Sequence, residues 1–331
     1  MLTGGAGYIG SHVVKELLKK GKYEVTVIDN LSTGFQETID RLKQHYGDFV
    51  FERLDLSDWD ALHIFMQKNR FDAIIHFAAA LIVPESVENP LKYYLNNTAN
   101  TANLIQEAME NGVKKFIFSS TAAVYGEPEC VPMGGIKEEA PTYPINPYGQ
   151  SKLMSEQILK DTANAYSDFK YVALRYFNVA GADIEGKIGQ STKDATHLIK
   201  VAAEAALGKR EKMYIFGDDY PTPDGSCIRD YIHVDDLSQA HLDALEYLDK
   251  EKSDVFNVGY GRGYSVKEVI EMMKKVSGVD FPVEITGRRA GDPAILIANS
   301  QKIQQKMGWK PKYDDLELIC KTALEWEKKL T

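Results

Sequence analysis

A tyrosine and a lysine four positions apart are the residues best suited to proton-transfer chemistry. Tyr148 and Lys152 lie in the segment NPYGQSK (146–152), and residues four apart on a helix share one face, with Cβ atoms about 5–6 Å apart. A free phenol has a pKa of about 10 and is a poor base at neutral pH. A neighbouring ammonium group favours the phenolate and lowers that pKa. The pair is therefore a candidate base with its activating cation, although Tyr-x-x-x-Lys also occurs often by chance.

Hydroxyl side chains end an apolar run at a second place. The segment FSSTAAVYG (118–126) has two serines before Thr121 and two alanines, Ala122 and Ala123, directly after it. The alanines leave no acid or base beside the threonine in the sequence. A strand-end hydroxyl that satisfies the local backbone is the alternative, and it explains the hydroxyl but not the whole combination.

A glycine-rich turn stands at the start of the chain. TGGAGYIG (3–10) carries Gly4, Gly7 and Gly10 directly before the helix-like segment SHVVKELL. Glycines at this spacing allow a tight turn, close approach to a pyrophosphate and close packing of helix on strand. The amino terminus of the helix offers free N–H groups to the phosphates. An ordinary glycine-rich turn is the alternative.

A carboxylate at the expected distance strengthens the dinucleotide interpretation. Asp29 ends the next predicted strand, 19 residues past Gly10. Such a carboxylate accepts hydrogen bonds from both hydroxyls of an adenosine ribose and repels a 2′-phosphate. The sequence therefore favours NAD over NADP, with capping of the following turn as the weaker reading of Asp29.

Short β-rich runs alternate with helical stretches along the first half of the chain. Several of the runs are apolar on both faces, as buried parallel strands are. The runs cover 23–29, 49–55, 72–78, 114–120 and 170–177, and the helical stretches cover 11–21, 58–69, 97–111 and 151–166. This alternation predicts right-handed crossovers and an α/β fold with a doubly wound parallel sheet.

The rhythm loosens after about residue 178, where glycines and prolines cluster. We therefore predict two domains, 1–177 for the dinucleotide and 178–331 as a smaller α/β substrate domain, with some later segments returning to the first. Only Met1, Leu2 and Thr3 precede Gly4. A strand there is either very short or the sequence lacks a few residues.

Composition narrows the class of protein. The 331 residues are 44% hydrophobic and carry a net charge of −9, which argues against a nucleic-acid partner. Cys130, Cys227 and Cys320 are widely spaced, which favours reduced thiols, and no metal site is predicted. The start has no secretory pattern and the longest apolar run, 73–83, is about half a membrane span. We expect a soluble, cytoplasmic protein with no membrane partner.

Together these motifs resemble the extended short-chain dehydrogenase/reductase family. The resemblance covers nearly the whole chain, and its second-half stretches are similar to the nucleotide-sugar branch, most closely its 4-epimerases. The segments that carry it are TGGAGYIG (3–10), the Asn-Asn pair at 96–97, FSSTAAVYG (118–126), YGQSK (148–152), LRYFNVAGA (174–182), GDDYPTPDGSCIRDYIHVDDL (217–237) and RRAGDPA (288–294). It implies a Rossmann domain, bound NAD and inversion at C4 of a UDP-hexose through a 4-keto intermediate.

The resemblance implies a role for each candidate residue. Tyr148 is the base, Thr121 hydrogen-bonds the sugar's 4-hydroxyl and Lys152 holds the nicotinamide ribose. The implied cofactor-binding residues are Gly4, Gly7, Tyr8, Ile9, Gly10, Asp29, Asn30, Asp55, Leu56, Phe77, Ala78, Ala79, Asn96, Ser119, Tyr148, Lys152 and Tyr176. The implied substrate-binding residues are Thr121, Tyr148, Asn178, His197, Leu198, Tyr214, Phe216, Arg229, Tyr231, Arg289, Asp292 and Leu296, with the two arginines on the diphosphate.

Two positions bear on the range of sugars and on the cofactor. Related enzymes carry either a tyrosine or a smaller residue at Leu296, and leucine favours acceptance of N-acetylhexosamines as well as glucose and galactose; simple core packing of Leu296 is the alternative. Many relatives have a lysine where this chain has Leu81. One cationic contact to the cofactor is therefore missing.

Two classes of rival function are considered, another reaction on the same scaffold and a non-catalytic role, together with one assembly. Dehydratases of this branch carry Asp-Glu after the threonine, where this chain has Ala122 and Ala123; a decarboxylase or C5 epimerase is a further rival. A non-catalytic NAD sensor commonly loses the tyrosine or lysine that is present here. The resemblance also implies a homodimer through the helices at about 90–111 and 151–166, to which Leu153, Ile158 and Leu159 could contribute.

Overall fold

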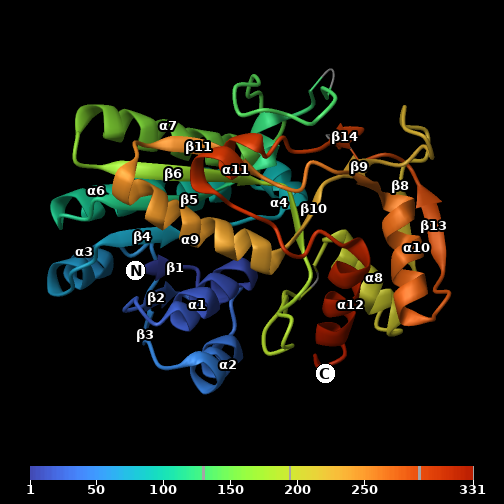
Figure 1. Cartoon of the computed structure of the whole chain (residues 1–331), viewed down its shortest axis with the longest axis horizontal. Coiled ribbons are helices and arrows are strands. Elements are labelled where there is room, and N and C mark those ends of the chain that lie inside the picture. The colour runs from blue at the N-terminus through green and yellow to red at the C-terminus, as the bar shows by residue number, and fades with distance from the viewer. Residues whose placement is uncertain (129–130, 194, 290–291, 331) are drawn as a thin grey trace.

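A seven-stranded parallel sheet forms the centre of the larger part of the molecule (Figure 1). The computed structural model describes residues 1–128, 131–193, 195–289 and 292–330. The strand order is β11-β6-β5-β4-β1-β2-β3. The strands are β1 (Leu2–Thr3), β2 (Thr26–Asp29), β3 (Val50–Arg53), β4 (Ala73–His76), β5 (Lys115–Thr121), β6 (Lys170–Tyr176) and β11 (Asp254–Val258). The prediction of an α/β fold with a doubly wound parallel sheet is confirmed.

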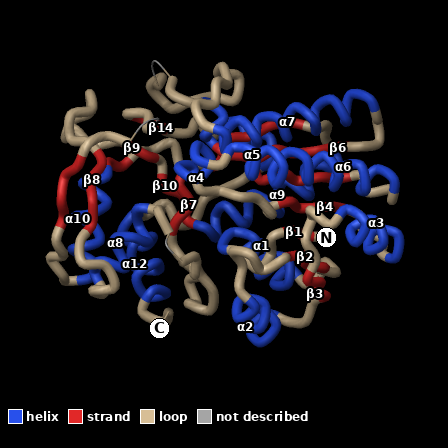
Figure 2. Tube along the Cα trace, turned by 180° about the vertical axis from the view of Figure 1, so that it is seen from behind, coloured by secondary structure: helices blue, strands red, loops and turns tan. Residues whose placement is uncertain are grey.

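Helices cover both faces of this sheet. One face packs against α1 (Tyr8–Lys20), α2 (Gln36–Tyr46) and α9 (Val234–Lys250), whose apolar residues share one core with the strands. The other face packs against α3 (Trp59–Lys68), α6 (Asn100–Glu110) and α7 (Pro147–Ala165), as the view from behind shows (Figure 2). Strands buried on both sides explain the continuous apolar runs of the sequence.

Element boundaries differ from the sequence predictions at several points. The first strand is only Leu2–Thr3, and α1 already begins at Tyr8 because its first turn belongs to the glycine-rich segment. The helix predicted at 97–111 begins earlier, with α4 (Val83–Glu88), α5 (Pro90–Tyr93) and a π-helical stretch, Tyr94–Ala99, before α6. These elements lie next to α7.

Three helices and three small sheets form the second part of the molecule. The helices α8 (Leu198–Ala206), α10 (Val266–Ser277) and α12 (Leu316–Glu327) share an apolar core. The strands pair as β7 (Asn178–Ala180) with β10 (Tyr231–His233), β8 (Met213–Phe216) with β13 (Val283–Thr286), and β9 (Ile228–Arg229) with both β12 (Tyr264–Ser265) and β14 (Ile295–Leu296). A short helix, α11 (Gln301–Met307), packs near β11.

Segments from the second half of the chain complete the first sheet. The strand β11 pairs in parallel with β6, from Asp254 opposite Val172 to Val258 opposite Tyr176. The helix α9 lies across the same face as α1 (Figure 1). The larger part of the fold is therefore built from two stretches of sequence.

Buried polar contacts join α1 to segments of the second half. Lys15 Nζ donates to Asp183 Oδ1 at 3.0 Å and to Asp235 Oδ1 at 2.5 Å, and all three side chains are buried. The Tyr8 hydroxyl donates to the Gly181 carbonyl at 2.6 Å. The helix that begins in the glycine-rich turn is thus fixed to the segment that follows β7. We call Lys15, Asp183 and Asp235 the joint cluster.

Cysteines and membrane segments complete the description. Cys227 and Cys320 are free and buried, whereas Cys130 lies outside the described residues. Among the helices of the described residues, none combines the length and apolarity that a membrane crossing requires.

Candidate active site

The helix α7 carries the tyrosine–lysine pair in its first turns. The Asn146 side chain caps it by accepting from Gly149 N at 2.9 Å, and Pro147 occupies the first helical position. A Cβ at Gly149 would stand 2.7 Å from the Ala123 carbonyl oxygen. Glycine next to Tyr148 therefore lets α7 approach the turn that follows β5.

Lys152 is buried beneath this turn. Its Nζ donates to the Ser119 carbonyl at 2.8 Å and lies 4.9 Å from the centre of the Phe118 ring. Burial lowers the pKa of Lys152 to about 7, and the Glu156 carboxylate opposes that shift. The ammonium group therefore depends on nearby negative charge to stay protonated.

Tyr148 and Thr121 meet at the carboxyl end of β5. Burial raises the pKa of Tyr148, and a hydrogen bond with Thr121 acts in the opposite direction. Thr121 also accepts from Ala123 N at 3.1 Å, which fixes its side chain. The pKa of Tyr148 is thus set by burial and Thr121, and Lys152, whose Nζ donates to the Ser119 carbonyl, does not produce the lowering that we expected.

Neutral groups surround the pair. The Tyr176 hydroxyl hydrogen-bonds Ser119 Oγ, and burial raises the pKa of Tyr176. Burial lowers the pKa of His76 to about 3, and the ring lies between the hydroxyls of Thr3 and Thr101 at 2.7 and 2.8 Å. His76 and Tyr176 are therefore uncharged near neutral pH, and the charges described close to the pair are those of Lys152 and Glu156.

The glycine-rich turn forms a cradle that other residues would fill. Gly4 has a φ of 77°, and its Cβ would lie 2.7 Å from Ala78 N; a Cβ at Gly10 would lie 2.2 Å from the Gly4 carbonyl oxygen. Gly7 caps α1, and Tyr8 and Ile9 open its first turn. These first-turn N–H groups suit a pyrophosphate. The cradle therefore fits a dinucleotide.

Asp29 is held by the backbone around the cradle. Its Oδ2 accepts from Ala6 N at 3.0 Å and its Oδ1 from Leu31 N at 2.8 Å. Asn30 Nδ2 donates to Asp55 Oδ2 at 2.8 Å on the neighbouring strand end. Each carboxylate oxygen keeps a second lone pair, which suits the two ribose hydroxyls of NAD.

The remaining predicted cofactor positions border the same strand ends. Phe77, Ala78 and Ala79 follow β4, whose last residue pairs with Thr3, and Leu56 is buried after β3. The sequence analysis noted the pair at 96–97 but assigned only Asn96 to the cofactor. Asn97 Oδ1 accepts from Ala80 N at 2.8 Å, Asn97 Nδ2 donates to Ala80 O at 2.9 Å, and Asn96 Nδ2 donates to Asn97 Oδ1 at 3.0 Å. The doubled asparagine was a signal for this clamp.

The small sheets bring the predicted substrate residues together. Asn178 lies opposite Tyr231 in the β7–β10 pair, and Leu296 lies opposite Arg229 in the β14–β9 pair. Arg229 Nη2 is 3.6 Å from Asp292 Oδ1. Arg289 is exposed and its guanidinium lies 3.7 Å above the Phe216 ring. Tyr214 is exposed beside Phe216, with ring centres 6.3 Å apart.

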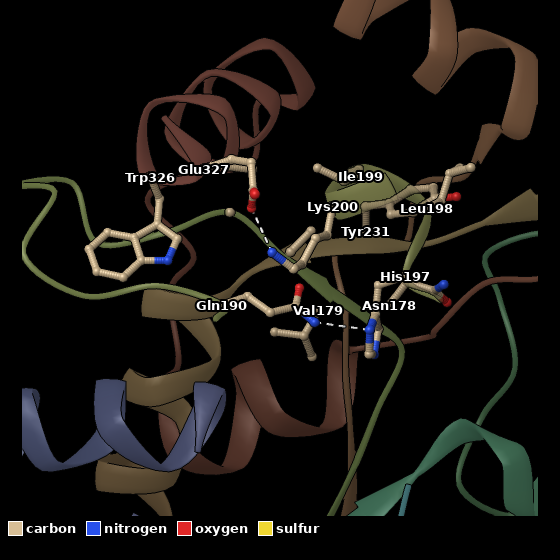
Figure 3. A pocket seen from close by; sticks show the side chains of 13 residues that line it. Asn178, Val179, Gln190, His197, Leu198, Ile199, Lys200, Tyr231, Trp326 and Glu327 are labelled. Carbon is tan, nitrogen blue, oxygen red and sulfur yellow. Dashed lines mark hydrogen bonds and ion pairs between the residues drawn. The ribbon is translucent and has the colours of Figure 1, made fainter. Parts of the chain in front are cut away.

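Several of these residues line a pocket between β7, β10, α8 and α12 (Figure 3). Asn178, His197, Leu198 and Tyr231 line it, and Gln190 Nε2 lies 2.9 Å from His197 Nδ1. Lys200 and Glu327, which the sequence analysis did not select, form a 2.6 Å ion pair in its wall. No local motif marks that pair because its members are far apart in the sequence.

Comparisons with known proteins agree with this geometry. The model of the NAD dependent epimerase/dehydratase family matches residues 1–259. A UDP-glucose 4-epimerase of Azospirillum brasilense is 50% identical over 331 residues, which is 100% of this chain and 92% of the relative. A solved UDP-Glc/GlcNAc 4-epimerase from Campylobacter jejuni is 58% identical, with a TM-score of 0.87 over 99% of this chain and 98% of its own.

A second solved structure shows which ligands such a fold can hold. The UDP-glucose 4-epimerase from Bifidobacterium longum, in complex with NAD+ and UDP, is 40% identical. Its TM-score is 0.94 over 99% of this chain and 97% of its own.

Proposed function

The chain belongs to the NAD-dependent epimerase/dehydratase family, and from that premise we propose that it inverts C4 of a UDP-hexose through a 4-keto intermediate. One observation carries the proposal most directly. Tyr148 and Thr121 meet beside a buried Lys152, and alanines occupy the two positions after Thr121. The site therefore has a proton acceptor for a sugar hydroxyl and little else that could alter a ketone.

The protein residues move and hold the proton. Tyr148, as phenolate, takes the proton of the 4-hydroxyl while Thr121 orients that hydroxyl, and the proton returns to O4 when the ketone is reduced. Lys152, as ammonium, favours the phenolate. Bound NAD supplies the hydride acceptor and donor for C4. The sugar turns between the two hydride steps and presents its other face, so that C4 is inverted.

The cradle and its surroundings would hold the cofactor. The first-turn N–H groups of α1 would bind the pyrophosphate, Asp29 would accept from the adenosine ribose hydroxyls, and Lys152 would bind the nicotinamide ribose. The exposed Leu81 offers no cation at the position where relatives have lysine. Residues 1–177, with the returning β11 and α9, would form the NAD-binding domain, and the other residues from 178 the nucleotide-sugar domain.

The cations of the second domain would clamp the diphosphate while the sugar turns. Arg229 is buried at the end of β9, and Arg289 lies over the Phe216 ring in the segment that follows β13. Guanidinium groups form paired hydrogen bonds with phosphate oxygens. Asn178, Tyr231, His197, Leu198, Tyr214 and Asp292 complete the proposed substrate site.

The site disfavours a dehydratase. Elimination of water next to the ketone needs an acid and a base close to C5 and C6. Ala122 is buried and Ala123 half-buried at the positions where such groups would stand. The intermediate is therefore left with reduction as its exit.

We also propose that both glucose-type and N-acetylglucosamine-type sugars are accepted. Leu296 packs with Ala122 and Phe177 in a small apolar cluster directly beyond Thr121, so its size bears on the wall of the sugar site. The Campylobacter jejuni relative is a UDP-Glc/GlcNAc 4-epimerase, which supports this substrate range.

A homodimer is the assembly that the surface favours. Leu91 is 69%, Leu95 65% and Met154 40% exposed, on α5, the π-helical stretch and α7, which lie against one another. Exposed apolar residues grouped on neighbouring helices are typical of an interface. Leu159 belongs to the core instead, because it is fully buried. Sedimentation of the wild-type protein and of Leu95→Arg tests this proposal. The wild type should be a dimer and the variant a monomer, and a monomeric wild type would contradict the proposal.

One incubation experiment tests the function. Purified protein is denatured and the released NAD is assayed, while native protein is incubated with UDP-galactose and with UDP-N-acetylgalactosamine and the products are identified by NMR. We expect the corresponding glucose-type sugars in both reactions. A 4-keto-6-deoxy product, or no reaction with either sugar, would contradict the proposal.

A further inference from the structure

Ser120 lies between Ser119 and Thr121, to which roles have been assigned, but its side chain contacts Glu156. It is fully buried, and its hydroxyl donates to the Glu156 carboxylate on α7. Glu156 is also buried and pairs with Arg175 of β6: Arg175 Nε lies 2.9 and 3.2 Å from the two carboxylate oxygens, and Nη2 lies 2.6 Å from Oε2. Charge is thus balanced inside the fold, directly beneath the end of β5.

Three side chains on one face of α7 bind the end of β5. Tyr148, Lys152 and Glu156 follow one another at intervals of four and therefore lie in one row along the helix. Their partners are the Thr121 side chain, the Ser119 carbonyl and the Ser120 hydroxyl. The third contact therefore fixes the strand residue that lies between the partners of the first two.

Arg175 anchors this row to other elements. Its Nη1 donates to the Tyr125 hydroxyl at 3.1 Å and to the Glu138 carbonyl at 3.3 Å, and its guanidinium lies 5.0 Å from the Tyr125 ring centre. The Tyr125 hydroxyl in turn donates to Asn257 Oδ1 of β11 at 2.7 Å. The turn after Thr121 and the last strand of the sheet thus hold Arg175, which holds Glu156.

We propose that Glu156 and Arg175 are a positioning pair for the reaction, which sets the register of α7 against β5 and places a carboxylate one helical turn from Lys152. The inference rests on the proposed roles of Tyr148 and Lys152. Neither Glu156 nor Arg175 touches the sugar in this proposal. Both act through Ser120 and Lys152.

The charges around Lys152 explain the second part of this role. Glu156 on α7 and His76 on β4 interact with its charge, and Tyr176 of β6 hydrogen-bonds the side chain of Ser119, whose carbonyl accepts from Lys152. Burial keeps His76 and Tyr176 neutral near pH 7, since it lowers the pKa of His76 and raises that of Tyr176. Glu156 raises the pKa of Lys152. Without the carboxylate, Lys152 would lose its proton at lower pH, and the buried Arg175 charge would be left unbalanced.

The test compares Glu156→Gln with the matched control Glu107→Gln. Glu107 on α6 is also a buried helical glutamate, but it pairs with His63 of α3 and not with a residue of α7 or β5. For wild type and both variants, bound NAD, thermal midpoint and the pH profiles of kcat and kcat/KM for UDP-galactose are measured. In Glu156→Gln we expect the alkaline limb of kcat to move about one unit to lower pH, with KM little changed. Glu107→Gln should keep the wild-type profile.

Two further variants separate charge from geometry. Ser120→Ala removes the strand contact and keeps the charges, so kcat should fall about tenfold without a shift of the alkaline limb. Glu156→Asp keeps the charge and should restore the limb. Should Glu156→Gln fail to fold, an unchanged kcat in folded Ser120→Ala would still overturn the inference.

The outcomes separate this inference from the function beneath it. An inactive wild-type protein would overturn the proposed function and the inference together. An active wild type with superimposable pH profiles for Glu156→Gln overturns the inference alone, as does an equal shift in Glu107→Gln.

Discussion

The two halves of the candidate site hold their polar groups in different ways. In the larger part of the fold, Lys152 and Ser120 are buried and bonded to partners within the sheet or α7. In the second part of the fold, Arg229 Nη1 donates to the Ile228 carbonyl at 2.9 Å and Nη2 lies 3.6 Å from Asp292 Oδ1, while Arg289 lies exposed on an aromatic ring. The partners of Lys152 and Ser120 are fixed within the fold. The contacts of Arg229 with Asp292 and of Arg289 with Phe216 can be replaced by contacts with an anion.

This difference matches the work proposed for each half. Proton transfer needs atoms placed within a few tenths of an ångström, which only buried, mutually bonded groups provide. A diphosphate is recognised mainly by charge and paired hydrogen bonds, which arginine side chains supply. We call the first half, with Tyr148 and Lys152, the rigid wall of the site, and the second half, with Arg229 and Arg289, the adaptable wall.

The largest effect is expected at the rigid wall. Tyr148→Phe should lower kcat by roughly 10²–10⁴-fold, because it removes the proton acceptor. The affinity for UDP, measured by calorimetry, should change less than about twofold, since the diphosphate contacts remain. Tyr166→Phe, at the exposed end of α7, is the control. Comparable kcat values for Tyr148→Phe and wild type would remove Tyr148 from the mechanism.

A second large effect, on the free energy of unfolding, is expected at the joint cluster. Lys15→Met leaves the buried Asp183 and Asp235 without their cation and should lower the free energy of unfolding by about 3–5 kcal/mol. Lys19→Met, which breaks an exposed pair with Glu185 one turn later, should cost less than about 1 kcal/mol. Equal losses in denaturant titrations would show that the joint cluster contributes no more than a surface pair.

The pH dependence of stability follows from the same cluster. Lys15 lowers the pKa of Asp183 below its usual value of 3.8. A depressed carboxyl pKa contributes stability above about pH 4 that is lost as pH falls through the folded-state pKa. Wild-type stability should therefore decline in acid, and Lys15→Met should reduce this slope. A parallel decline in both proteins would contradict the assignment.

A smaller effect is expected at the adaptable wall. Arg229→Ala should weaken UDP binding by about 10- to 100-fold through the loss of charged hydrogen bonds, and it should raise KM more than it lowers kcat. Arg262→Ala, which removes an exposed arginine paired with Asp314, should leave both parameters unchanged. A fall in kcat alone would move Arg229 to the catalytic wall.

The smallest effect concerns the choice of sugar. Leu296→Tyr should lower kcat/KM for UDP-N-acetylgalactosamine by about tenfold, because the larger ring narrows the pocket, and change UDP-galactose turnover by less than about threefold. Leu296→Ala is the size control and should retain both sugars. Equal losses on both sugars for Leu296→Tyr would indicate a packing defect in the apolar cluster of Leu296.

Short-range patterns predicted the sheet and the first contacts of the site. The glycine spacing, Asp29 and the Tyr148–Lys152 interval each express local geometry, so they are readable without a structure. The ion pairs Glu156–Arg175 and Lys15–Asp183 were not predicted, because the two members of each pair are separated in the sequence and only the fold brings them together. The very short first strand that the sequence allowed is present as Leu2–Thr3, whereas the π-helical stretch at 94–99 was not predicted, since it has no distinctive local pattern.

The return of β11 to the edge of the sheet affects how the protein is made. β6 ends at Tyr176 and its outer neighbour begins only at Asp254. While the ribosome synthesises the intervening residues, β6 exposes an unpaired edge and α1 lacks α9 above it. Open strand edges and uncovered apolar helices favour association between nascent chains. A polypeptide released after residue 177 should accordingly aggregate instead of persisting as a free nucleotide-binding unit.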